Sequence, residues 1–86
     1  MIGLDRATME VDMDHPRIVS DPAVMMGKPV VRGTRITVEF ILRMLGSGWT
    51  VEEFVREYDH VSREDVLAAQ TYAAERLAAA TSSAAE

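Results

Sequence analysis

The spacing of apolar residues changes near Thr37, from the short alternating runs of strands to the longer repeat of amphipathic helices. Upstream, residues 18–19 and 30–31 are apolar pairs separated by turn-forming residues, which is typical of brief strands. We therefore expect a small β element in which the first pair lies beside the second or beside Ile36. Residues 9–14 alternate apolar and acidic side chains, and this pattern predicts a short edge strand.

Downstream, three stretches place apolar residues on one helical face. The first helix is predicted to follow the N-cap residue Thr37 and to stop at Gly46. The second begins at Thr50 with a capping-box pattern, and the third and longest follows Ser62. The expected inner faces are Val38, Ile41, Leu42 and Leu45, then Val51, Phe54, Val55 and Tyr58, then Val66, Ala69, Ala73 and Leu77.

Three helices of about 9, 8 and 17 residues with short connections have the dimensions of a helix-turn-helix unit. The expected fold class is therefore α+β, mainly α: a short N-terminal β element followed by a three-helix helix-turn-helix unit. We expect residues 1–16 to form an N-terminal extension, residues 17–80 a single domain, and residues 81–86 a tail that frays.

Composition limits what such a chain can do alone. With 86 residues, it buries only about 60% of its unfolded surface, so we expect a homodimer or a protein partner. The absence of cysteine excludes disulfides and thiolate zinc sites. No apolar run is long enough for a membrane span and no signal-peptide pattern is present, so a cytoplasmic location is expected.

Charge is distributed unevenly along the chain. The net charge is −5, but residues 28–43 sum to +3, between segments of −3 and −5. An acidic chain is a poor general ligand for nucleic acid, because that affinity comes mostly from neutralising phosphates. Any contact with nucleic acid or with an acidic partner is therefore expected at residues 28–43, which we call the basic segment.

The motifs of this region resemble the domain-of-unknown-function 433 (DUF433) family. The match runs from Ile18-Val19-Ser20-Asp21-Pro22 through Gly27-Lys28-Pro29 and Arg32-Gly33-Thr34-Arg35 to Tyr72-Ala73. Met26 departs from the pattern, since relatives often carry Gly or His there. The resemblance implies a homeodomain-like helix-turn-helix fold and a role as the antitoxin of a type II toxin–antitoxin pair, bound to a PIN-like ribonuclease toxin.

Residues 32–35, called the arginine turn below, allow two interpretations. In the first, Gly33 needs a positive φ, Thr34 bonds local backbone, and the two arginines pair with acidic neighbours. The acidic neighbours available for such pairing are Glu39, Glu52, Glu53 and Asp65. In the second, the arginines use their bidentate forks on phosphate or on the carboxylates of a partner.

The candidate site residues fall into three groups. Lys28, Arg32, Arg35, Arg63 and Gln70 are candidates for binding nucleic acid or a partner; Gly27, Pro29, Gly33 and Thr34 are expected to build the turns; Phe40, Met44 and Trp49 are candidates for a dimer or toxin interface. Both histidines, at positions 15 and 60, are expected to be ordinary loop residues.

No arrangement of residues predicts catalysis, a metal site or a cofactor, so we expect no enzyme. The function expected is an antitoxin that covers the active site of a nuclease and regulates its own promoter. The alternative is a free-standing helix-turn-helix regulator that binds DNA without a toxin. Glu64 and Asp65 at the start of the third helix repel phosphate, so a dimer presenting two basic segments is the expected DNA contact.

Overall fold

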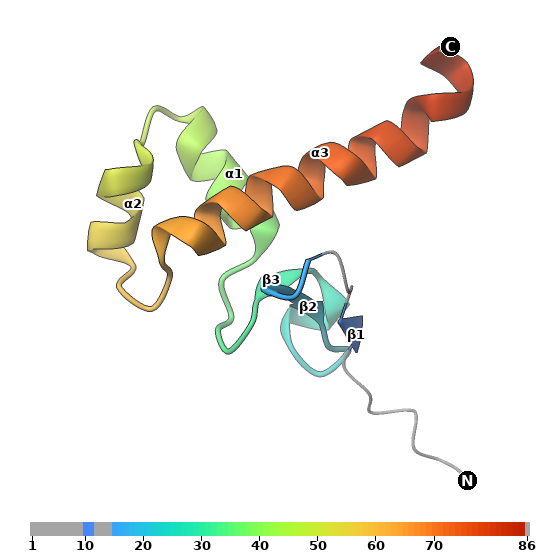
Figure 1. Cartoon of the computed structure of the whole chain (residues 1–86). Coiled ribbons are helices and arrows are strands. Elements are labelled where there is room, and N and C mark those ends of the chain that lie inside the picture. Colours follow the sequence, from blue (N-terminus) through green and yellow to red (C-terminus); the bar gives the residue numbers. More distant parts are fainter. Residues whose placement is uncertain (1–9, 12–14, 86) are drawn as a thin grey trace, which may run out of the picture.

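A three-stranded antiparallel sheet forms the N-terminal part of the fold in the computed structural model, which describes residues 10–11 and 15–85 (Figure 1). Its strands are β1 (Glu10–Val11), β2 (Ile18–Ser20) and β3 (Val30–Val31), in that spatial order. The predicted hairpin is confirmed: β2 pairs with β3, with Ile18 opposite Val31. A short turn of helix, η2 (Met25–Gly27), lies in the connection between these two strands.

The segment after β3 folds back on the sheet as well. The backbone N–H of Val31 donates to the carbonyl oxygen of Ile36 at 2.9 Å, and Val30 forms an isolated bridge with Thr37. The basic segment is therefore attached to the sheet at both ends of the arginine turn. This attachment gives the turn a defined position beside the first helix.

Three helices follow: α1 (Val38–Gly46), α2 (Val51–Glu57) and α3 (Arg63–Ala85). Each predicted cap is present. Thr37 Oγ1 accepts a hydrogen bond from the Phe40 N–H at 2.9 Å, and Thr50 forms a capping box with Glu53. Ser62 and Asp65 exchange hydrogen bonds in the same reciprocal way at the start of α3. These caps satisfy backbone donors that have no partner inside the helix.

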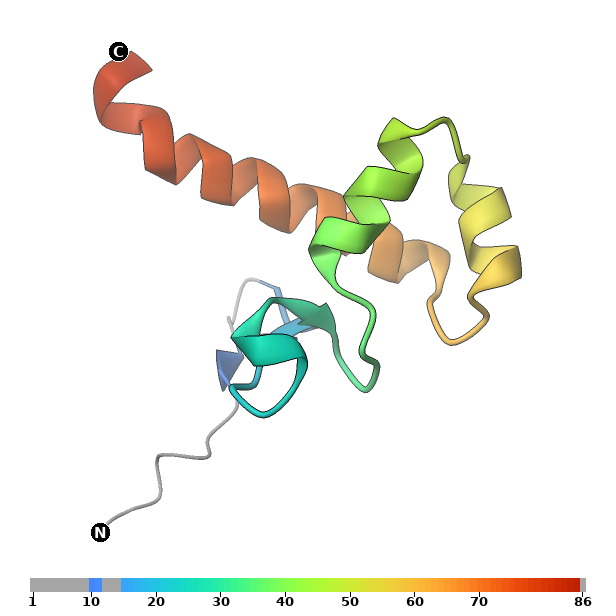
Figure 2. The same ribbon diagram turned by 180° about the vertical axis from the view of Figure 1, so that it is seen from behind.

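The core lies where β2, β3 and the helices meet. It consists of Ile18, Val31, Val38, Ile41, Phe54, Val61, Val66, Ala69 and Tyr72. Figures 1 and 2 show the first half of α3 packed against α1 and α2, while its second half extends away from the rest of the molecule. The predicted fold class is confirmed: a short β element is followed by three helices.

One expectation for α3 differs from the structure. Leu77, predicted on its inner face, is 67% exposed because this part of the helix extends beyond the sheet and the other helices. The buried aromatic of the helix is instead Tyr72. The backbone is helical as far as Ala85, past Ala80, in keeping with the high helix propensity of alanine. Among the described residues, no helix is long and apolar enough to cross a membrane.

Candidate partner-binding site

The arginine turn is held by local hydrogen bonds. Gly33 has a φ of +81°, which a residue with a side chain rarely adopts. Thr34 Oγ1 donates to the carbonyl oxygen of Val31 and accepts from the Ile36 N–H, both at 2.9 Å. The turn geometry is therefore that of the first interpretation, with Gly33 and Thr34 in structural roles.

The four carboxylates considered as partners of the turn bond to other groups. Glu39 pairs with Lys28 and Arg43, Glu52 pairs with Arg63, Glu53 accepts from the Thr50 N–H, and Asp65 pairs with Arg17. Arg32 and Arg35 are exposed, and neither guanidinium group bonds to any part of the chain that the structure describes. The arginines of the turn thus do not pair with any of these four carboxylates, and this half of the first interpretation is wrong for them.

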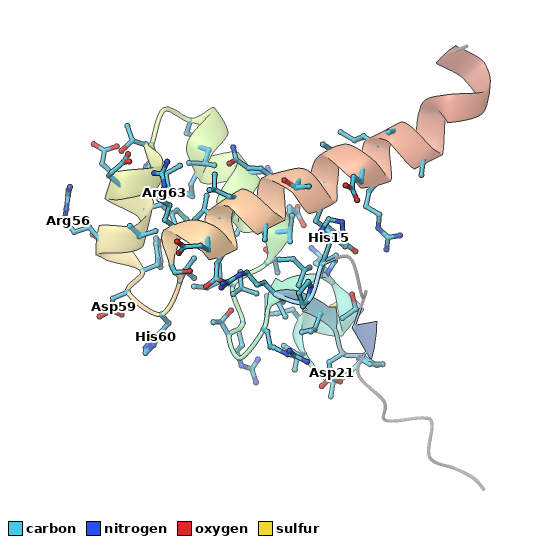
Figure 3. All side chains as sticks on the ribbon, in the orientation of Figure 1. His15, Asp21, Arg56, Asp59, His60 and Arg63 are labelled. Atoms are coloured by element: carbon cyan, nitrogen blue, oxygen red, sulfur yellow. The ribbon has the colours of Figure 1, made fainter. Side chains whose placement is uncertain are left out.

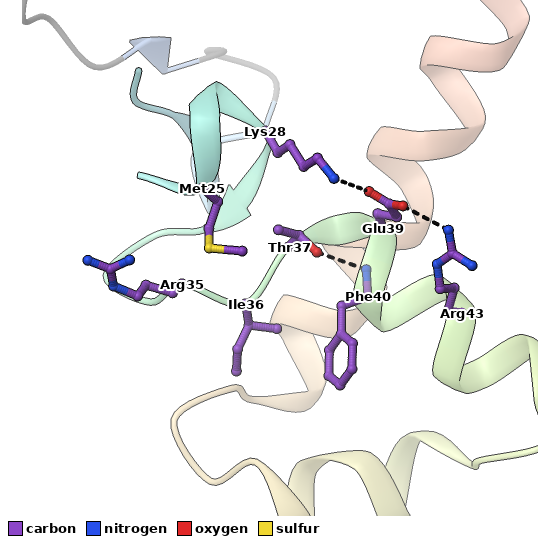
Figure 4. A pocket seen from close by; sticks show the side chains of 8 residues that line it. All are labelled: Met25, Lys28, Arg35, Ile36, Thr37, Glu39, Phe40 and Arg43. Atoms are coloured by element: carbon purple, nitrogen blue, oxygen red, sulfur yellow. Dashed lines mark hydrogen bonds and ion pairs between the residues drawn. The ribbon is translucent and has the colours of Figure 1, made fainter. Parts of the chain in front are cut away.

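Lys28 has a different environment from the two arginines of the turn. Its Nζ lies 3.0 Å from Glu39 Oε1, while Arg43 Nη2 lies 2.9 Å from Glu39 Oε2 (Figure 4). Hydrogen bonds from Arg43 and then Lys28 hold the pKa of the Glu39 carboxyl below its ordinary value. This three-residue cluster joins the loop before β3 to the first turn of α1.

The connection between β2 and β3 carries unusual backbone conformations. Met25, Met26 and Gly27 have φ values of 48°, 58° and 83°, so two side-chain-bearing residues adopt left-handed backbone in succession. A conformation of this kind costs on the order of 1–3 kcal/mol at each non-glycine residue, and it persists only where the surrounding structure enforces it. Met26 is 87% exposed, and Met25 is also exposed. Met26 departs from the family pattern, but nothing in the sequence assigns Met25 or Met26 to a site.

A groove lies between η2, the arginine turn and α1. Its volume is about 410 Å³, and its lining residues are Met25, Lys28, Arg35, Ile36, Thr37, Glu39, Phe40 and Arg43 (Figure 4). The Met25 side chain points toward the side on which Ile36 and Phe40 lie, and the Arg35 guanidinium extends away from the Glu39 cluster. We call this cavity the Met25 groove. It brings together two of the predicted binding residues, Lys28 and Arg35, with the interface candidate Phe40.

The remaining candidates lie elsewhere. Arg63 Nη1 bonds to Glu52 Oε2 at 2.9 Å where α2 and α3 meet (Figure 3), and Gln70 is exposed on α3. Met44 packs half-buried against the core, and the half-buried Trp49 ring lies 6.4 Å from Tyr58, measured between centroids. Phe40 also packs against Tyr58, with ring centroids 5.4 Å apart. Among the described residues, no group of three or more His, Asp or Glu side chains is placed to hold a metal ion.

Comparisons with known proteins agree with the motif pattern. The family model described as "protein of unknown function (DUF433)" matches residues 18–73. A crystal structure of a DUF433 member protein from Anabaena variabilis ATCC 29413 is similar in fold, with a TM-score of 0.66 and 29% sequence identity. The similarity covers 69% of this chain and 58% of the Anabaena chain, and the search of curated proteins found no match. Because the family model spans both the arginine turn and the helical core, the chain belongs to the DUF433 family.

Proposed function

We propose that this protein is an antitoxin, which binds and neutralises a PIN-like ribonuclease toxin through the arginine turn. The observation that carries the proposal concerns Arg32 and Arg35. Both are exposed and form no ion pair with a described residue, while Glu39, Glu52, Glu53 and Asp65 bond to other groups. A guanidinium fork matches a carboxylate in a bidentate geometry. Two such forks on a turn fixed by hydrogen bonds suit a partner surface rich in acidic side chains.

A nuclease active site built from clustered carboxylates is a surface of this kind. An arginine placed among these carboxylates would neutralise the charge that holds the catalytic metal ions. Outside the basic segment the antitoxin is acidic, since the whole chain has a net charge of −5 although this segment contributes +3. The acidic part would complement the basic surface that a nuclease uses to hold RNA. The proposed antitoxin therefore provides local positive charge at the active site and negative charge around it.

The proposal is tested by co-expression with the small protein encoded beside this chain's gene. A stable complex should form, and growth arrest by that nuclease should be relieved. Replacing both Arg32 and Arg35 by Ala should weaken the complex by about 100-fold or more, since buried charge pairs at interfaces cost at least 2–5 kcal/mol when truncated. Arg56→Ala is the matched control, because Arg56 is also exposed and forms no ion pair with a described residue. Equal affinity of the double variant and the control would rule out the arginine turn as the contact.

Promoter binding is a second candidate, favoured by the short connection between α2 and α3, because a helix-turn-helix unit likewise joins two helices by a short turn. A homodimer would present two arginine turns to the phosphate backbone. Glu64 and Asp65 in the first turn of α3 oppose this use of the helix. Binding of a promoter fragment should weaken steeply with salt and be lost in the double arginine variant. Binding without salt dependence would contradict phosphate contact.

A further inference from the structure

We propose that the Met25 groove holds an acidic, amphipathic peptide segment of the protein partner, with one apolar side chain on its floor and a carboxylate on Arg35. This inference rests on the proposed function for the identity of the partner, and it adds the chemistry of the segment that the partner contributes. The groove volume of about 410 Å³ lies within the range of about 300–1,000 Å³ in which ligand pockets occur.

The floor of the groove is apolar. Met25, Ile36 and Phe40 line it, and the Phe40 ring is supported from behind by Phe54 and Tyr58, at centroid distances of 6.0 and 5.4 Å. The Met25 side chain is more adaptable than the Phe40 ring, since a thioether chain can change its conformation to fit the side chain placed against it. A rigid aromatic wall opposite an adaptable methionine is suited to an aliphatic or aromatic side chain of a partner.

Met25 reaches the groove from the unusual backbone of η2. The φ of Met25 is 48°, in the left-handed region, and the φ of Met26 beside it is 58°. The two neighbouring residues share the same kind of backbone but differ in position, because Met25 lines the groove and Met26 does not. This difference provides a matched pair of positions for testing the groove.

The rim selects the charge of the occupant. Three cations line the groove, Lys28, Arg35 and Arg43, against the single carboxylate of Glu39. Lys28 and Arg43 both bond to that carboxylate, whereas Arg35 forms no ion pair with a described residue. The Arg35 guanidinium beside an apolar floor fits a carboxylate next to an apolar side chain. A phosphate backbone would instead need a row of free cations.

The test uses the full chain, labelled with ¹³C at its methionine methyl groups, and a short N-acetylated peptide in which leucine alternates with glutamate. Titration followed by NMR should shift the Met25 methyl resonance to saturation, and added salt should weaken the binding. Two control peptides separate the contributions. One replaces leucine by glycine, the other replaces glutamate by lysine, and neither should bind.

Variants then locate the peptide. Met25→Glu puts a carboxylate in the floor of the groove, and Arg35→Glu reverses the charge at position 35. Each substitution should weaken peptide binding by about 10-fold or more. Met26→Glu and Arg56→Glu make the same chemical changes outside the groove and should leave the affinity unchanged. An unshifted Met25 methyl group, or equal affinities for Met25→Glu and Met26→Glu, would overturn the proposal. Displacement of the peptide by duplex DNA would overturn it too.

These measurements are made without the nuclease, so the two proposals fail separately. If the protein binds the nuclease but not the peptide, the antitoxin proposal stands and the proposal that the groove is the contact is wrong. A chain that binds the peptide in the groove but no nuclease retains the peptide site and loses the antitoxin role.

Discussion

His15 Nε2 lies 2.6 Å from Glu75 Oε1, and this contact connects the segment before β2 to α3 across 60 residues of sequence. The imidazole is only 6% exposed and meets the Tyr72 ring edge-on, with centroids 5.3 Å apart. Arg76 covers the Tyr72 ring from 5.1 Å and donates to its hydroxyl oxygen. His15 is therefore part of the packing between the β element and α3. The expectation of an ordinary loop residue is wrong for it.

Replacing His15 by Ala should lower the free energy of unfolding by about 1–3 kcal/mol, because it removes a hydrogen bond and an aromatic contact together. Urea denaturation followed by circular dichroism measures the change. His60→Ala is the control: His60 is exposed in the turn between α2 and α3, so its loss should alter stability by no more than about 0.5 kcal/mol. Equal effects of the two substitutions would contradict a packing role for His15.

Glu39 predicts a pH dependence of stability. Arg43 and Lys28 lower the pKa of its carboxyl below the ordinary value of 4.5 in the folded protein, so the unfolded chain binds this proton more tightly. The stabilisation is fully present above pH 4.5 and is lost as the pH falls through the lower, folded-state pKa. Glu39→Gln should therefore destabilise the protein near neutral pH and have a smaller effect in acid.

Urea midpoints of the two proteins, measured at about pH 7 and about pH 3, check this expectation. Salt should reduce the difference, because Glu39 is exposed. Glu57→Gln is the control, since Glu57 forms no ion pair with a described residue and the substitution should leave the pH dependence nearly unchanged. If the destabilisation caused by Glu39→Gln grew as the pH fell, the pKa of Glu39 would not be lowered in the folded protein.

The positive φ of Gly33 predicts a loss of stability on substitution that does not arise from side-chain contacts. A methyl group at this position would meet no atom within 4 Å, so Gly33→Ala introduces no clash. The substitution should nevertheless cost about 1–2 kcal/mol, because it forces alanine into left-handed backbone at φ +81°. Gly46→Ala, in the last residue of α1 and equally open, should be neutral or stabilising by up to about 1 kcal/mol. Thermal unfolding of both variants distinguishes the cost of backbone strain from the cost of a steric clash.

Local features of this protein could be read directly from its sequence. The caps at Thr37, Thr50 and Ser62, the inner faces of α1 and α2, and the pairing of β2 with β3 all depend on residues close together in the chain or on a simple repeat. The motif that marks the family is likewise a contiguous pattern around the arginine turn.

The sequence does not predict a residue's role where that role depends on distant parts of the chain. Periodicity placed Leu77 inside, but burial needs a neighbouring element, and α3 has passed the end of the core at that point. The charges along the sequence identify the basic segment without showing which of its cations pair with other described residues. That depends on Glu39, Glu52 and Asp65 being brought to other partners. Sequence alone therefore determined the elements and the family. Packing decided that Arg32 and Arg35 have no ion-pair partner among the described residues and that Met25 lines a groove, because contacts between distant residues exist only in the folded chain.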